Sequence, residues 1–191
     1  MQTFVAALFM GFSPVVAADT SPDLAMLVAF QEACARVDDL DHMLADARRS
    51  GWEAIADDGD PRIGRVTRAG RAGVNANVRA SGQTFRRHLR ARDLFLVASR
   101  VVMDDGSWGN GCRLFHFEAT DRINRTTLEL WMRRPPTGVQ DIPGNALKLL
   151  WEPGWREGVT IEINHIPPRS KLRSRLGLSG NILVAQAIGG F

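Results

Sequence analysis

Tyrosine is absent from this chain of 191 residues, only two residues are cysteine, and only two of the 24 basic residues are lysine. After residue 18 no uncharged apolar run approaches the roughly 20 residues that a membrane-spanning helix needs. The remaining chain is therefore expected to have no transmembrane segment. Its apolar content is typical of a globular domain.

Sequence motifs of catalysis are also missing. The chain has no G-x-S-x-G elbow, no Walker loop, no G-x-G-x-x-G fingerprint and no H-E-x-x-H pair. His116 and Glu118 have the H-x-E spacing of zinc deaminases, but the P-C-x-x-C partner motif of that family is lacking. These two residues are weak catalytic candidates, and we expect no enzyme activity, no cofactor and no metal site.

The first residues have the character of an export signal. Residues 4–18 carry no charge, are mostly apolar and end in small residues before Asp19. This pattern predicts a signal peptide over residues 1–18, cleaved before Asp19, although no basic residue precedes the apolar run. The alternative is a buried N-terminal helix. Export would place the protein in the bacterial periplasm.

Cys34 and Cys112 are the only cysteines. In an exported protein an even, small number of cysteines favours a disulfide. The alternative makes Cys112 a nucleophile, which would need a base within contact. His116 is four residues further along the same predicted strand, about 13 Å away at the rise of a strand. We therefore predict a Cys34–Cys112 disulfide.

Charge is distributed very unevenly. Residues 19–60 hold 11 acidic and 3 basic side chains, whereas residues 61–92 hold nine arginines and no acid. Such a basic block attracts anions. It binds either an external anionic partner or the acidic segment of its own fold. Nucleic acid is disfavoured, because Phe85 is the only aromatic residue in the block and stacking on bases needs several.

Periodicity and capping signals predict an α+β fold. Residues 22–37 and 38–49 are expected to form two helices or one bent helix, and a third helix is expected between a cap at Thr120-Asp121 and a stop at Pro135-Pro136. A hairpin is expected over 94–103 and 112–119, and strands over 159–163 and 182–188. Residues 57–92 show no clear pattern and are predicted to be an irregular loop or a poorly ordered arm, with a short helix or the start of a strand at Phe85–Leu89 as the alternative. The prediction is a single domain over 19–191, with an antiparallel sheet of about four or five strands and two or three helices on one face.

These observations favour a small, exported, non-catalytic binding protein. The predicted contact residues are Arg86, Arg87, Arg90 and Arg92, together with Trp108 at the hairpin tip. The partner would be an anionic envelope polymer or an acidic protein. The alternatives are an envelope hydrolase built around His116 and Glu118, and an inhibitor or immunity-type protein. A sugar-binding surface formed by several of the five tryptophans is a further alternative.

Overall fold

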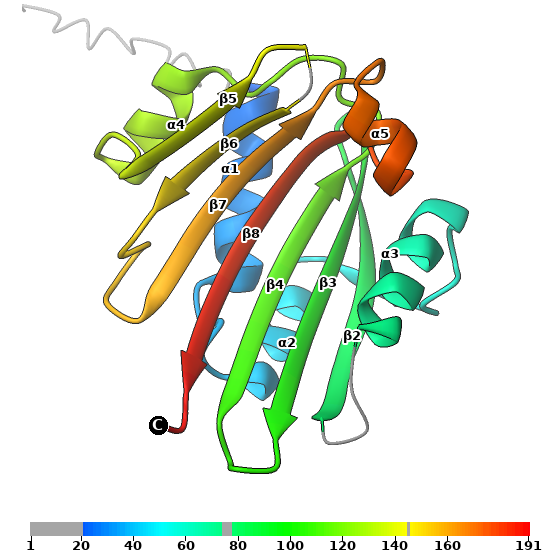
Figure 1. Cartoon of the computed structure of the whole chain (residues 1–191), viewed down its shortest axis with the longest axis vertical. Coiled ribbons are helices and arrows are strands. Elements are labelled where there is room, and N and C mark those ends of the chain that lie inside the picture. Colours follow the sequence, from blue (N-terminus) through cyan, green and yellow to red (C-terminus); the bar gives the residue numbers. More distant parts are fainter. Residues whose placement is uncertain (1–20, 74–77, 145) are drawn as a thin grey trace, which may run out of the picture.

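The computed structural model describes residues 21–73, 78–144 and 146–191. In these residues eight strands form one antiparallel sheet, and five helices pack around it (Figure 1). The predicted signal peptide over residues 1–18 lies outside the described residues. None of the described helices is long and apolar enough to cross a membrane.

The strands are arranged in the order β1-β2-β3-β4-β8-β7-β6-β5. Along the chain the elements are α1 Pro22–Cys34, α2 Leu40–Arg49, β1 Glu53–Ile55, α3 Pro61–Ala72, β2 Val78–Leu89, β3 Arg92–Met103, β4 Trp108–His116, α4 Arg125–Met132, β5 Gly138–Ile142, β6 Ala146–Trp151, β7 Val159–Ile166, α5 Lys171–Leu176 and β8 Gly180–Gly189. The last strand thus inserts between β4 and β7 and joins the two halves of the sheet.

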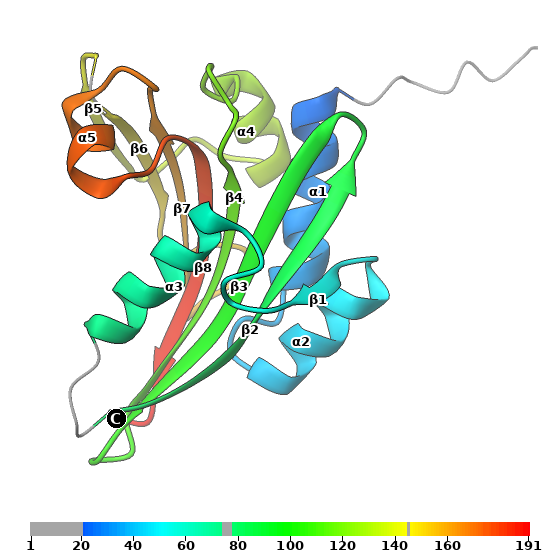
Figure 2. The same ribbon diagram turned by 90° about the vertical axis from the view of Figure 1, so that its right-hand side faces the viewer.

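The expectation of a four- or five-stranded sheet covered on one face is wrong. Helices α1, α2 and α4 cover one face, here called the back face, whereas α3 and α5 lie on the opposite front face (Figure 2). The two core clusters reflect this division. The larger cluster lies between the back face and α1, α2 and α4. The smaller lies on the front face and contains Ile63, Phe95, Phe115 and Phe117.

The expectation that residues 57–92 are irregular is also wrong, because this segment contains α3 and β2. Helix α3 begins where Pro61 occupies its first turn and Asp60 accepts a hydrogen bond from the Arg62 amide at 2.8 Å. These residues are a typical helix start. Strand β2 pairs with β3 along its whole length, although only Thr84 and Phe85 of its side chains are buried.

At the start of α1, unlike at β2, the local sequence predicted the structure. Ser21 caps α1 by accepting a hydrogen bond from the Leu24 amide at 3.2 Å, as the Ser-Pro-Asp sequence predicts. The helix ends at Cys34, whose disulfide partner Cys112 lies on β4, with 5.7 Å between the two Cα atoms. The predicted disulfide is confirmed, and it fastens α1 to the back face. Because both thiols are oxidised, Cys112 is not a free nucleophile.

Candidate functional site

Two of the predicted contact arginines pair with acidic residues of α1. Arg92 lies 2.9 Å from Asp23, and Arg87 lies 3.6 Å from Glu32. All four side chains are at least partly exposed, so each pair contributes little to stability. The two pairs matter for the charge of this surface, because Asp23 and Glu32 neutralise arginines that were predicted from the sequence to contact a partner.

The remaining predicted arginines lie around the β2–β3 turn. Arg86 donates to Asp93 at 2.8 Å, and this contact raises the pKa of its guanidinium. Arg90 has a positive φ of 55° in the turn itself. Earlier in the block, Arg71 pairs with Asp57 and Arg62 pairs with Asp60. Five of the nine arginines of the basic block thus pair with acidic residues of the protein itself.

Trp108 begins β4 and does not project from the hairpin tip. Its indole is partly buried and packs against the back-face core, and the Arg100 guanidinium lies 5.2 Å from its ring centroid. Gly189 on the neighbouring strand leaves the space that this ring occupies, since a Cβ there would come within 2.6 Å of it. Trp108 is thus placed as a packing residue.

The weak catalytic pair is not assembled in the structure. His116 is 8% exposed at the end of β4, and its buried Nδ1 atom has no hydrogen-bond partner among the described residues. Burial, reinforced by the charge of Arg92, lowers the pKa of His116. The exposed Glu118 pairs instead with Arg62. Within the described part of the chain no carboxylate forms a hydrogen bond with His116 that could activate it.

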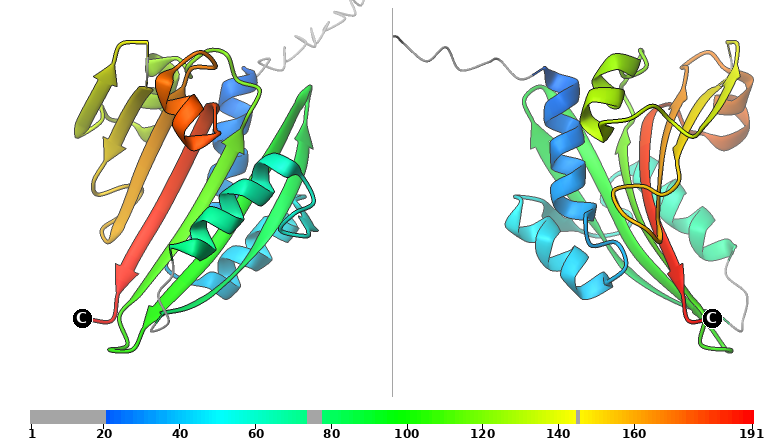
Figure 3. Two further views of the ribbon diagram at one scale, coloured as in Figure 1. Left: turned by 45° about the vertical axis from the view of Figure 1, so that its right-hand side comes forward. Right: turned by 90° about the vertical axis from the view of Figure 1, so that its left-hand side faces the viewer.

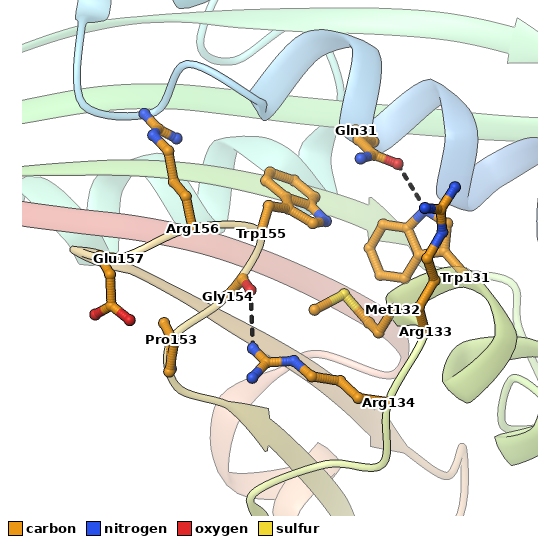
Figure 4. Close-up of a pocket in the computed structure, with 10 residues that line it drawn as sticks. All are labelled: Gln31, Trp131, Met132, Arg133, Arg134, Pro153, Gly154, Trp155, Arg156 and Glu157. Atoms are coloured by element: carbon orange, nitrogen blue, oxygen red, sulfur yellow. Dashed lines mark hydrogen bonds between the residues drawn. The ribbon is translucent and has the colours of Figure 1, made fainter.

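One hollow lies on the back side of the sheet, near α4 (Figure 4). It has a volume of about 700 Å³ and is walled by Trp131 and Trp155, whose ring centroids are 5.8 Å apart at nearly a right angle. Both rings also pack against Phe30 of the core, at 6.3 Å and 5.6 Å. The tryptophans of this pocket therefore have a structural role that accounts for their position.

Polar groups of this tryptophan pocket are largely engaged by the protein. The Trp131 indole nitrogen donates to Gln31 at 3.0 Å, and Arg134 donates to the Gly154 carbonyl at 2.8 Å (Figure 4). Arg156 points away from the rings and donates to the Ala35 carbonyl at 2.9 Å. These contacts hold the Trp155 loop against α1 and α4. Two donors of the pocket remain outside them, the Trp155 indole nitrogen, which has no hydrogen-bond partner among the described residues, and the Arg133 side chain.

Helix α3 lies across the front face of the sheet (Figure 3, left). A second hollow, here called the α3 groove, is lined by residues of α3 and of strands β2, β3, β4 and β8. It has a volume of about 640 Å³. Its floor contains a row of small residues in register across three strands, Gly82 on β2, Ser99 on β3 and Gly111 on β4. Because these residues lack bulk, the sheet leaves room beneath the helix.

Helix α3 is held above this floor by its N-terminal connection. The buried Thr84 hydroxyl donates to the Asp57 carboxylate at 2.7 Å, and the Thr67 hydroxyl donates to the Asp57 carbonyl at 3.1 Å. Ile63 anchors the first turn of the helix in the front-face core. The helix therefore forms a fixed wall of the groove.

Among the described strands, Arg113 is the charged residue of this groove that lies on the front face of the sheet, since the register places Arg100 on the back face. It lies on the front face of β4, and its Nη1 atom donates to the Ser99 hydroxyl at 3.3 Å. The guanidinium lies over Gly111, where a Cβ would come within 2.4 Å of Nη1. Glycine at position 111 therefore gives Arg113 the space to lie flat along the floor.

No carboxylate among the described residues forms an ion pair with Arg113. Glu162, on the same face two strands away, attracts it but is paired with Lys148 at 2.9 Å. Burial lowers the pKa of Arg113 despite this attraction, although a guanidinium stays charged at neutral pH. A partly buried cation without a counter-ion raises the free energy of the folded state.

Arg113 was not among the residues predicted from the sequence, although one signal was present. It interrupts a short apolar stretch, with Cys112 before it and Leu114 and Phe115 after it. A charge at such a position has to meet a partner, a cavity or solvent. The density of arginine at residues 61–92 drew attention to side chains that the fold neutralises.

Metal chemistry receives no support from the described residues, in which no three histidine, cysteine or acidic side chains converge. Comparison with protein-family models, curated proteins and solved structures gives no match. The α3 groove with Arg113 is therefore the candidate site on physical grounds alone.

Proposed function

We propose that this protein is an exported, non-catalytic binding protein that holds an anionic group on Arg113 in the α3 groove. The observation that supports this most strongly is the partly buried guanidinium without an acidic partner. A bound anion would supply the missing counter-charge and accept hydrogen bonds from the guanidinium. The Cys34–Cys112 disulfide fits an oxidising compartment, and we propose the bacterial periplasm.

The proposal retains the anionic ligand expected from the sequence but moves its contact. Arg86, Arg87 and Arg92 each have an acidic partner within the protein. An external anion would have to compete with those carboxylates, whereas at Arg113 it would not. A groove of about 640 Å³ also has the size of a small-ligand site rather than of a flat surface for a protein partner.

Small anions provide the direct test. The disulfide-bonded protein would be titrated with butanoate or inorganic phosphate while the side-chain Nε–Hε signals of its arginines are followed by NMR. We expect a saturable shift of the Arg113 signal. The Arg113→Gln variant should lose the binding, and the matched Arg86→Gln variant should keep it. Equal, non-saturating shifts at Arg86 and Arg113 would refute the proposal.

Gly111 allows a second test that leaves the charge in place. Alanine there would push the guanidinium off the floor, since its Cβ would come within 2.4 Å of Nη1. The Gly111→Ala variant should therefore bind butanoate more weakly while remaining folded. Unchanged affinity in this variant would mean that the anion contacts Arg113 elsewhere than over Gly111.

A further inference from the structure

The floor of the α3 groove changes from polar to apolar along the strands. Two residues beyond the row that contains Gly111, the register brings together Ala80 on β2, Val101 on β3, Gly109 on β4 and Ile188 on β8. A Cβ at Gly109 would lie 3.4 Å from a Val101 methyl and 3.7 Å from an Ile188 methyl. The glycine therefore leaves a shallow trough between two aliphatic side chains.

At the other end of the α3 groove, beyond Arg113, packed aromatic side chains fill the space between α3 and the sheet. Beyond Arg113, Phe95 and Phe115 are almost completely buried with Phe117 beneath the first turn of α3. Their packing leaves no room for a ligand. A molecule whose charged group contacts Arg113 is therefore blocked at this end, and the apolar part of the groove floor lies in the direction of Val101 and Ile188.

Exposed apolar side chains gather at the end toward which the trough leads. Ile188 is 68% exposed, Met103 on the same face is 50% exposed, and the C-terminal Phe191 is 96% exposed. The C-terminus lies beside the β3–β4 hairpin in both views of Figure 3. Large apolar side chains grouped in this way often mark a contact with an apolar partner.

From this arrangement we infer that the ligand is a single-chain amphiphile, with its anionic head on Arg113 and its alkyl chain in the trough over Val101 and Ile188. The inference rests on the proposed function, because Arg113 has to bind the head. A carboxylate and a phosphate head satisfy the same guanidinium, and the two are separated below by experiment. The chain leaves the groove toward the hairpin end, past Met103.

Chain length is the variable that tests this inference. Full burial of a methylene strengthens binding about fourfold, and burial on one side only, as in an open groove, should give about twofold. Octanoate has four more methylenes than butanoate and should bind about 16-fold more tightly. Both would be titrated into the protein by calorimetry below the concentration at which they form micelles, with octyl phosphate as the second head group and octanol as the uncharged control.

Variants locate the chain and the head separately. Ile188→Ser should weaken octanoate binding several-fold and leave butanoate binding unchanged. Because the Ile188 side chain is exposed, the variant should remain folded. The matched control, Val139→Ser, changes a residue that is 52% exposed on the far edge strand and should alter neither affinity. Arg113→Gln should weaken both ligands.

The outcomes separate the two proposals. If butanoate binding requires Arg113 but octanoate binds no more tightly than butanoate, the inference of an amphiphilic ligand is wrong and the proposed anion site is retained. If no anion binds, both are wrong. If octanol binds as well as octanoate, or Arg113→Gln leaves octanoate binding intact, the head does not lie on Arg113. Preference for octyl phosphate over octanoate, or the reverse, would identify the head group.

Discussion

Replacing Arg113 by methionine should make the protein more stable while abolishing anion binding. Methionine keeps an unbranched stem of similar length and removes the charge. If Arg113 served the fold, the substitution would lower stability. If Arg113 binds a ligand instead, its buried charge destabilises the folded protein when no ligand is bound. The substitution should then remove this destabilisation. The sign of the change in unfolding free energy therefore distinguishes the two roles.

The size of the effect follows from the contacts of Arg113. Within the described residues its only hydrogen bond, to Ser99, is long at 3.3 Å and contributes about 0.5 kcal/mol. Replacing charged buried groups by apolar side chains of similar volume often stabilises a protein by about 1–4 kcal/mol. Because Arg113 is only partly buried and Glu162 attracts it, we expect a gain of about 1–2 kcal/mol.

The assay is equilibrium denaturation of the disulfide-bonded protein at neutral pH, in buffer without phosphate or carboxylate. The matched control is Arg62→Met. Arg62 pairs with Asp60 at 2.9 Å and its guanidinium lies over Phe95 and Phe117, so its replacement should cost about 1–2 kcal/mol. A loss of stability in Arg113→Met similar to that in the control would refute the reasoning.

Three further predictions concern the rest of the molecule. Replacing Cys34 and Cys112 together by alanine should lower the unfolding free energy by about 4.5 kcal/mol, because the bridge closes a loop of 78 residues; a loss below about 1 kcal/mol would contradict this loop-entropy argument. Burial lowers the pKa of His116 below the unfolded value of about 6.5, so its contribution to stability is present above that pH and is lost as pH falls through the folded pKa. The His116→Gln variant should therefore lose less stability than the wild type between pH 7.5 and 5 in urea titrations, and an unchanged slope would show that other groups dominate. Replacing Arg87 by serine should cost less than about 1 kcal/mol in the same titrations, because its contact with the half-exposed Glu32 is 3.6 Å long; a larger loss would mean that the pair is more strongly coupled than its geometry indicates.

Sequence patterns were reliable where local chemistry determines the structure. The Ser21 cap, the β-branched strand over 94–103 and the pair of cysteines each predicted what the structure contains. Strand β2 was not predictable in this way. Only Thr84 and Phe85 of its side chains are buried, so no alternation of apolar residues marks it. Its backbone pairing with β3 keeps it in the sheet, and such pairing leaves no trace in the sequence.

The candidate site was missed for a related reason. The sequence shows how many arginines there are but not which of them meets a carboxylate. Asp23 and Glu32 become partners of Arg92 and Arg87 only because α1 packs across the back of the sheet. Arg113 remains without such a partner because the acidic residue nearest on its face is paired with Lys148. Only the three-dimensional arrangement reveals this difference.

The most direct test of the account is a crystal structure of the protein with bound octanoate. The account predicts the carboxylate within hydrogen-bond distance of the Arg113 guanidinium above Gly111, and the alkyl chain running over Val101 toward Ile188. Octanoate bound instead between Trp131 and Trp155, with the α3 groove unoccupied, would contradict the assignment of Arg113 as the anion-binding residue.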